Sequence, residues 1–191
     1  MGRIILTGGI SSGKSTVSKT LEKNGIVIID ADVLSFNIFQ RNISIIQKMF
    51  NTSLRGPELR KFVGTVIFSN PLMKLKLEAF MHPKIRNLIK QRERKYKDIP
   101  HVIDMPLYFE TKHFLDDDYV ILLSIPYDKQ LKRLMKRNNL TEDEANKRIL
   151  SQLPTAIKEQ KSDYIIKNSG TLKTLEKKVE KLVKDVFTKK D

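Results

Sequence analysis

The chain has 191 residues and a formal net charge of +14, from 36 lysines and arginines against 22 aspartates and glutamates. Cysteine is absent, which excludes a disulfide framework and a thiolate metal site, and makes the reducing cytoplasm the expected compartment. The three histidines lack zinc spacing, and no apolar run is long enough to span a bilayer. We therefore expect a single domain with a sizeable core and no membrane partner.

The basic charge fits a nucleic acid, a polyphosphate nucleotide or a second phosphorylated substrate as the partner. Most of the excess is lysine spread over helical stretches such as residues 173–190, as on a solvated helix face. Aromatic residues do not alternate with the basic ones as a base-stacking platform requires. The composition thus argues against a nucleic-acid partner and leaves the oligomeric state open.

The most informative motif follows the first predicted strand, Arg3–Thr7. Residues 8–16 read GGISSGKST, the phosphate-binding pattern GxxxxGK[ST] between a strand and a helix. Main-chain N–H groups of such a loop point inward at a helix N-terminus, Lys14 reaches the β- and γ-phosphates, and the Ser15 hydroxyl can ligate Mg²⁺. The motif predicts an ATP-type nucleotide site formed by Gly8, Gly9, Ile10, Ser11, Ser12, Gly13, Lys14, Ser15 and Thr16.

A helix is predicted over Lys14–Asn24, followed by a second buried strand over Ile26–Ile29 that ends in two aspartates. Ligands of open α/β sheets bind at the carboxyl ends of the strands, where a carboxylate can accept the proton of an attacking hydroxyl. We assign this role to Asp32 and a structural role at the turn to Asp30. The alternative is that one of the pair merely caps the next helix.

Residues 33 to about 97 have a helical pattern. Breaks are predicted at Arg55-Gly56-Pro57, at Asn70-Pro71 and at His82-Pro83, so several short helices are expected rather than one long helix. Strand patterns return at 101–104, 119–123 and 163–166, and a basic helix begins at Leu172. The alternation of strands and helices predicts a parallel sheet covered on both faces.

Two further helices, Asp128–Arg137 and Thr141–Leu153, are expected to meet at Asn138-Asn139, the second opening with a capping box. Their arginines Arg133, Arg137 and Arg148 carry planar guanidinium groups suited to phosphate, although any one of them can also lie on a solvated face.

Asp104 follows the apolar run of the third strand. This is the position at which the carboxylate of a P-loop enzyme holds Mg²⁺ through water. A base-reading Asn-Lys-x-Asp motif is missing after the strand at 119–125, which argues against a GTPase.

Several segments together carry a more specific pattern. Residues 6–16 and 29–32 are similar to the motifs L-T-G-G-I-G-S-G-K-S-T and I-D-A-D, and residues 60–68 to R-x-x-L-x-x-x-V-F. Residues 82–86 and 104–110 match H-P-x-I-R and D-x-P-L-L-F-E, while 131–152 and 168–170 are similar to a lid and a late N-[NS]-G turn. Over nearly its whole length the chain resembles the dephospho-coenzyme A kinase family.

The resemblance implies ATP-dependent phosphorylation of the ribose 3′-hydroxyl of dephospho-CoA, the last step of CoA biosynthesis, with Mg²⁺ as cofactor. ATP and dephospho-CoA are then the expected small-molecule partners. The implied catalytic residues are Asp32 as the base, Lys14 and Arg137. The implied binding residues are Arg133 and Asn168 for ATP, Arg60, His82, Arg86 and Asp32 for the acceptor, and Ser15 and Asp104 for the metal.

The fold implied is a three-layer α/β/α P-loop kinase with a five-stranded parallel sheet, forming one domain over 1–191. Its core is expected at about 1–32, 99–126 and 154–191, a helical acceptor-binding insertion at about 33–98 and a lid at about 127–153. Ser11 replaces a family glycine, which a negative φ would tolerate. Ser35-Phe36 replaces an Ala-Arg pair, and the segment between residues 39 and 55 is shorter than usual, so the departures border the acceptor site.

Two other functions stay open. One is another P-loop nucleotide or small-molecule kinase with altered acceptor specificity. The other is a non-catalytic nucleotide- or RNA-binding protein, against which Lys14, Ser15, Asp32 and Arg137 count. A salt-sensitive mobility shift with RNA and no ATP consumption would favour the latter.

Overall fold

The structure is a computed structural model that describes residues 3–111 and 118–188. The chain forms two compact units, one built from residues up to Asp30 and from Tyr96 onward, the other from Ala31–Lys95. No helix in these described ranges is long and apolar enough to cross a membrane.

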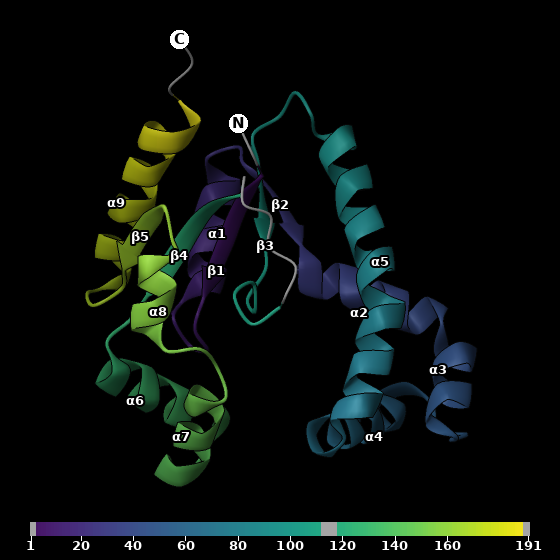
Figure 1. Ribbon diagram of the computed structural model, residues 1–191. Coiled ribbons are helices and arrows are strands. Elements are labelled where there is room, and N and C mark those ends of the chain that lie inside the picture. Colours follow the sequence, from purple (N-terminus) through teal and green to yellow (C-terminus); the bar gives the residue numbers. More distant parts are fainter. Residues whose placement is uncertain (1–2, 112–117, 189–191) are drawn as a thin grey trace. The chain divides into compact units, whose positions relative to one another are not determined.

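The first unit is built on a parallel sheet with strand order β2-β3-β1-β4-β5 (Figure 1). The strands are β1 (Ile4–Gly8), β2 (Val27–Asp30), β3 (His101–Asp104), β4 (Tyr119–Ser124) and β5 (Tyr164–Lys167). The predicted five-stranded parallel sheet and α/β fold are confirmed, with strand bounds shifted by one residue at most.

Both faces of the central strands are covered, because consecutive residues of these strands are buried. Leu6 and Thr7 of β1, and Leu122 and Leu123 of β4, point to opposite faces of the sheet and have almost no exposed surface. Helices α1 (Lys14–Lys23) and α9 (Leu172–Leu182) pack against each other and join the same core cluster, and α9 runs on into a π-helical turn, η1 (Val183–Phe187). The short α8 (Thr155–Gln160) packs on β4.

The register of the strands brings two carboxylates to one edge of the sheet. Asp30 of β2 pairs with Asp104 of β3, and Asp104 also pairs with Leu6 of β1, two residues before Gly8. The carboxyl ends of the parallel strands therefore meet where the phosphate loop begins, as in other open α/β sheets.

Helices α6 (Tyr127–Asn138) and α7 (Glu142–Leu150) pack on each other and meet at Asn139, whose φ is 50°. The predicted capping box is present: Thr141 and Glu144 each accept a hydrogen bond from the other's main-chain N–H. The predicted extension of this helix to residue 153 is wrong. Pro154 disfavours helical geometry in the residue before it, so the chain leaves α7 and restarts as α8.

The second unit consists of α2 (Ala31–Arg41), α3 (Ile43–Phe50), α4 (Gly56–Ser69) and α5 (Pro71–Lys95). Helices α2 and α4 both pack on α5, and a separate small core includes Ile46, Phe50, Leu59 and Val63. The predicted breaks at 55–57 and 70–71 are confirmed. Asn70 caps α5 by accepting a hydrogen bond from the Met73 N–H at 3.1 Å.

The predicted break at His82-Pro83 is wrong, because Pro83 lies inside α5, which runs for 25 residues. A proline removes one main-chain hydrogen bond from a helix and disturbs one turn. Met81 and Ile89, on either side of it, are both buried. Their packing stabilises the helix on both sides of the proline.

Candidate functional site

The phosphate loop joins β1 to α1 and has the backbone geometry that its sequence requires. Gly13 is the N-cap of α1 and adopts a φ of 98°, in the left-handed region that glycine tolerates. A Cβ atom on Gly13 would also lie 2.6 Å from the Asn168 side-chain nitrogen. The Gly13 carbonyl accepts the Thr16 N–H at 3.0 Å, so the helix starts immediately after the loop.

Ser11 departs from the expected geometry. A negative φ at this position would let serine replace glycine without cost. The φ of Ser11 is instead 57°. An L-residue in this region is disfavoured by about 1–2 kcal/mol. The rest of the loop must therefore hold Ser11 in place.

Lys14 forms an ion pair with the Oδ1 atom of Asp104. The other carboxylate oxygen of Asp104 accepts a hydrogen bond from the Ser18 hydroxyl at 3.0 Å. Asp104 is only 5% exposed, and both contacts offset the cost of burying its charge. They also hold the Lys14 ammonium at the carboxyl edge of the sheet, beside the loop.

The donor atoms here suit a hard divalent cation. Ser15 is exposed on the first turn of α1, and Asp104 offers a carboxylate at the adjacent strand end. The described part of the chain contains no cluster of three or more His, Cys, Asp or Glu residues that could enclose an ion.

Two of the predicted ATP residues lie together at the end of the loop. The buried Asn168 side chain donates to the Ser12 carbonyl at 2.7 Å, and its main-chain N–H donates to the Ser124 carbonyl at 2.7 Å. An Arg133 guanidinium nitrogen lies 3.9 Å from the position that a Cβ on Gly13 would occupy. Arg133 and Asn168 thus flank Gly13.

Arg137 is placed differently. It lies one turn beyond Arg133 in the last turn of α6, with an exposed side chain whose Nε donates to the Asn138 side-chain oxygen at 3.0 Å. A role for Arg137 on phosphate therefore stays a prediction.

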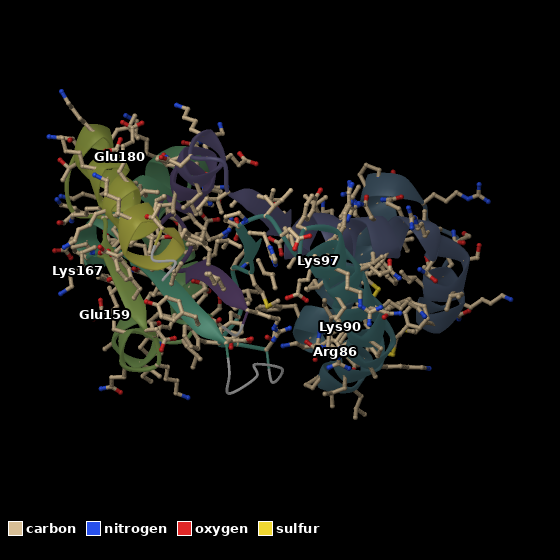
Figure 2. All side chains as sticks on the ribbon, turned by 90° about the horizontal axis from the view of Figure 1, so that it is seen from above. Arg86, Lys90, Lys97, Glu159, Lys167 and Glu180 are labelled. Atoms are coloured by element: carbon tan, nitrogen blue, oxygen red, sulfur yellow. The ribbon has the colours of Figure 1, made fainter. Side chains whose placement is uncertain are left out.

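The predicted acceptor residues all belong to the second unit. Asp32 lies in the first turn of α2, two residues after β2 ends. Arg60, on α4, places its guanidinium 4.9 Å from the centre of the Phe36 ring, the residue that departs from the family pattern. His82 and Arg86 are one turn apart on α5. Lys90 follows a turn after Arg86, and both are labelled in Figure 2.

The 104–110 motif makes structural contacts that its sequence did not predict. The Tyr108 hydroxyl donates to Asp118 at 2.9 Å, and burial together with this bond raises the pKa of Tyr108. Asp118 also accepts two hydrogen bonds from Arg3, each 2.7 Å long. Glu110 forms a 2.6 Å ion pair with the buried Lys158 of α8. The segment after β3 is thereby tied to α8 and to the start of β1.

Sequence reasoning missed Gln130, and it placed Gln152 in the lid pattern without its contact with the loop. Gln130 and Gln152 form hydrogen bonds to the main chain of Ile10. A cavity of about 630 Å³ borders Gly9 and both glutamines. Glu159 of α8 and Lys167 of β5, both labelled in Figure 2, also line it. Gln130 is a single buried glutamine in an amphipathic helix, which is a weak signal in the sequence alone.

The model of the dephospho-CoA kinase family matches residues 3–174 of the chain, which includes the phosphate loop, the second unit and the late turn at Asn168. The chain belongs to the dephospho-CoA kinase family. A curated dephospho-CoA kinase from Sulfurimonas denitrificans is 38% identical over 190 residues, covering 97% of this chain and 94% of the relative.

Two solved structures are similar to the chain over nearly its whole length. The structure of TT1252 from Thermus thermophilus has a TM-score of 0.86 and 27% identity, covering 97% of this chain and 98% of that one. The dephospho-CoA kinase from Campylobacter jejuni has a TM-score of 0.75 and 28% identity, with 96% of each chain covered. The chain is thus an enzyme of an ATP-dependent kinase family, whose members use a divalent metal ion with ATP.

Proposed function

We propose that the chain transfers the γ-phosphoryl group of ATP to the ribose 3′-hydroxyl of dephospho-CoA and releases CoA and ADP, the last step of CoA biosynthesis. One observation carries the proposal: the dephospho-CoA kinase family match spans residues 3–174, and so includes the donor loop and all the acceptor residues. We also place the reaction in the cytoplasm. The chain has no cysteine and so needs no oxidising compartment for disulfide formation.

On the donor side, the loop N–H groups and the N-terminus of α1 bind the phosphates, and Lys14 neutralises charge on the β- and γ-phosphates. The hydrogen bond from Asn168 to Ser12 and the position of Arg133 beside Gly13 support a role for both residues beside the nucleotide. Arg137 closes on the transferring group with its guanidinium fork. In this proposal α6 and α7 are the lid.

Mg²⁺ is the proposed metal. The Ser15 hydroxyl would ligate it directly, and the Asp104 carboxylate would hold it through water. The bound ion supplies positive charge to the phosphate oxygens. Asp104 would also position Lys14, because its Oδ1 atom forms an ion pair with the Lys14 ammonium.

On the acceptor side, the second unit binds dephospho-CoA. The Asp32 carboxylate accepts the proton of the 3′-hydroxyl as that oxygen attacks the γ-phosphorus, and ADP leaves with the electrons of the broken bond. Arg60, His82 and Arg86 are cationic or hydrogen-bonding groups suited to the phosphates of the CoA precursor.

The departure at Ser35-Phe36 makes acceptor identity the point to test. A coupled assay of ADP release is expected to show rapid turnover with dephospho-CoA and only background rates with other nucleotides or with no acceptor. A faster rate with another acceptor would favour the rival kinase. ATP binding with no turnover on any acceptor would favour a non-catalytic nucleotide-binding protein.

For the proposed lid, we expect Arg137→Lys to lower kcat by at least about tenfold while changing ATP affinity little, because an ammonium cannot reproduce the guanidinium fork. Arg94→Lys, the same change at the exposed end of α5, is the control and is expected to behave as the parent. Steady-state kinetics on both variants measure the difference. Equal kcat values in the parent and Arg137→Lys would return Arg137 to a solvated helix face.

A further inference from the structure

Two amide side chains bind both polar groups of the Ile10 main chain. Gln130 Nε2 donates to the Ile10 carbonyl at 2.9 Å, and the Ile10 N–H donates to Gln152 Oε1 at 2.9 Å. A main-chain N–H can only donate and a carbonyl can only accept. The Ile10 carbonyl therefore fixes the orientation of the Gln130 side-chain amide, and the Ile10 N–H fixes that of Gln152. Ile10 is therefore held from both sides of its backbone.

The two glutamines come from different elements. Gln130 lies on α6 and is only 3% exposed, while Gln152 lies in the connection between α7 and α8. Both approach the loop closely at Gly9, where a Cβ would lie 2.8 Å from Gln130 Nε2 and 3.6 Å from Gln152 Oε1. The glycine at position 9 therefore makes room for the glutamines as well as for the turn.

The loop has two features that make such bonds necessary. The cavity that borders Gly9, Gln130 and Gln152 leaves this side of the loop without close packing. Ser11, the next residue after Ile10, sits in the disfavoured left-handed region with a φ of 57°. On the other side of Ser11, Asn168 holds the Ser12 carbonyl at 2.7 Å, so a strained residue lies between two anchored ones.

We propose that Gln130 and Gln152 are positioning residues that hold the phosphate loop in its anion-binding form before the nucleotide arrives. The inference rests on the proposed role of this loop in binding ATP. A loop that is competent only part of the time binds with an affinity reduced by that fraction. The two glutamines raise the fraction of molecules with a competent loop without touching the phosphates, and they couple the loop to α6 and to the connection that follows α7.

The test uses Gln130→Met and Gln152→Met, which keep the approximate side-chain shape and remove the amide. Each variant is expected to weaken ATP binding by about three- to tenfold, the effect of losing one net hydrogen bond. Titration calorimetry without any acceptor measures Kd. In turnover assays KM for ATP should rise by a similar factor, while kcat at saturating ATP stays within about twofold, because bound ATP restores the loop.

Gln47→Met is the matched control. Gln47 Nε2 donates to the Leu54 carbonyl at 2.8 Å and to the Ser53 carbonyl at 3.3 Å within the second unit, so the change removes at least a comparable interaction away from the loop. Its Kd for ATP is expected to equal that of the parent, even if its thermal stability falls. Should the buried Gln130→Met fail to fold, Gln152→Met, in a half-buried connection, carries the test.

A second readout links the glutamines to Ser11. In the Gln152→Met background, Ser11→Gly should recover at least about half of the lost factor in affinity, because glycine adopts a positive φ without the Cβ penalty. No recovery, parental Kd values in both glutamine variants, or an equal loss in Gln47→Met would each overturn the inference. A parent that does not bind ATP would instead refute the proposed function.

Discussion

Replacing Lys14 by alanine is expected to abolish phosphoryl transfer. The ammonium is the positive charge that the loop directs at the β- and γ-phosphates, and no other loop side chain is cationic. ATP affinity should fall as well, because the same charge binds the ground state. Turnover with dephospho-CoA and Kd for ATP measure the two effects. A soluble Lys14→Ala protein with near-parental turnover would show that this loop is not the active one.

The ion pair with Asp104 complicates this variant in a testable way. Removing Lys14 leaves the buried Asp104 carboxylate with the Ser18 hydroxyl and without its charged partner, which is expected to lower stability. The double variant Lys14→Ala/Asp104→Asn should regain stability but not activity. Lys19→Ala, an exposed lysine on the same helix, is the control and should match the parent in both respects.

Replacing Asp32 by asparagine is expected to lower the rate with dephospho-CoA by about 10²- to 10⁴-fold, the usual cost of losing a general base. Asparagine keeps the size and hydrogen bonding of the side chain but cannot accept the proton, so binding of both substrates should persist. Single-turnover measurements at saturating ATP and dephospho-CoA report the chemical step directly.

Asp30→Asn is the matched variant, two residues away. Asp30 lies in β2 beside Asp104, and we expect its replacement to show mainly as a lower melting temperature, with little change in rate. The assignment of the base is wrong if Asp32→Asn is nearly as fast as the parent, or if Asp30→Asn carries the larger loss in rate.

The parts of this structure that the sequence predicts are those encoded locally. Apolar runs such as residues 119–123 predict buried parallel strands because both of their faces need cover. Aspartates that directly follow such runs, Asp30 and Asp104, are placed at the same sheet edge by the register alone. The phosphate loop is likewise a local pattern, and α1 starts at Lys14 as predicted.

The errors arise where tertiary packing decides. Pro83 predicts a helix break, yet buried residues on both sides of it keep α5 continuous. The sequence predicts that Ser11 is tolerated at a negative φ, yet its φ is positive, and its neighbours Ile10 and Ser12 bond to distant elements. The bond from Ile10 to Gln152 spans 142 residues and that from Gln130 spans 120, so no local pattern could reveal them.

Product identification tests the central claim most directly. The chain is incubated with equimolar ATP and dephospho-CoA, and the nucleotide products are separated and identified by mass and by the position of the new phosphate. We expect CoA phosphorylated at the ribose 3′-hydroxyl and ADP in equal amounts, with none formed by the Lys14→Ala variant. ADP formed without CoA, or dephospho-CoA left unchanged while another acceptor is phosphorylated, would contradict the account.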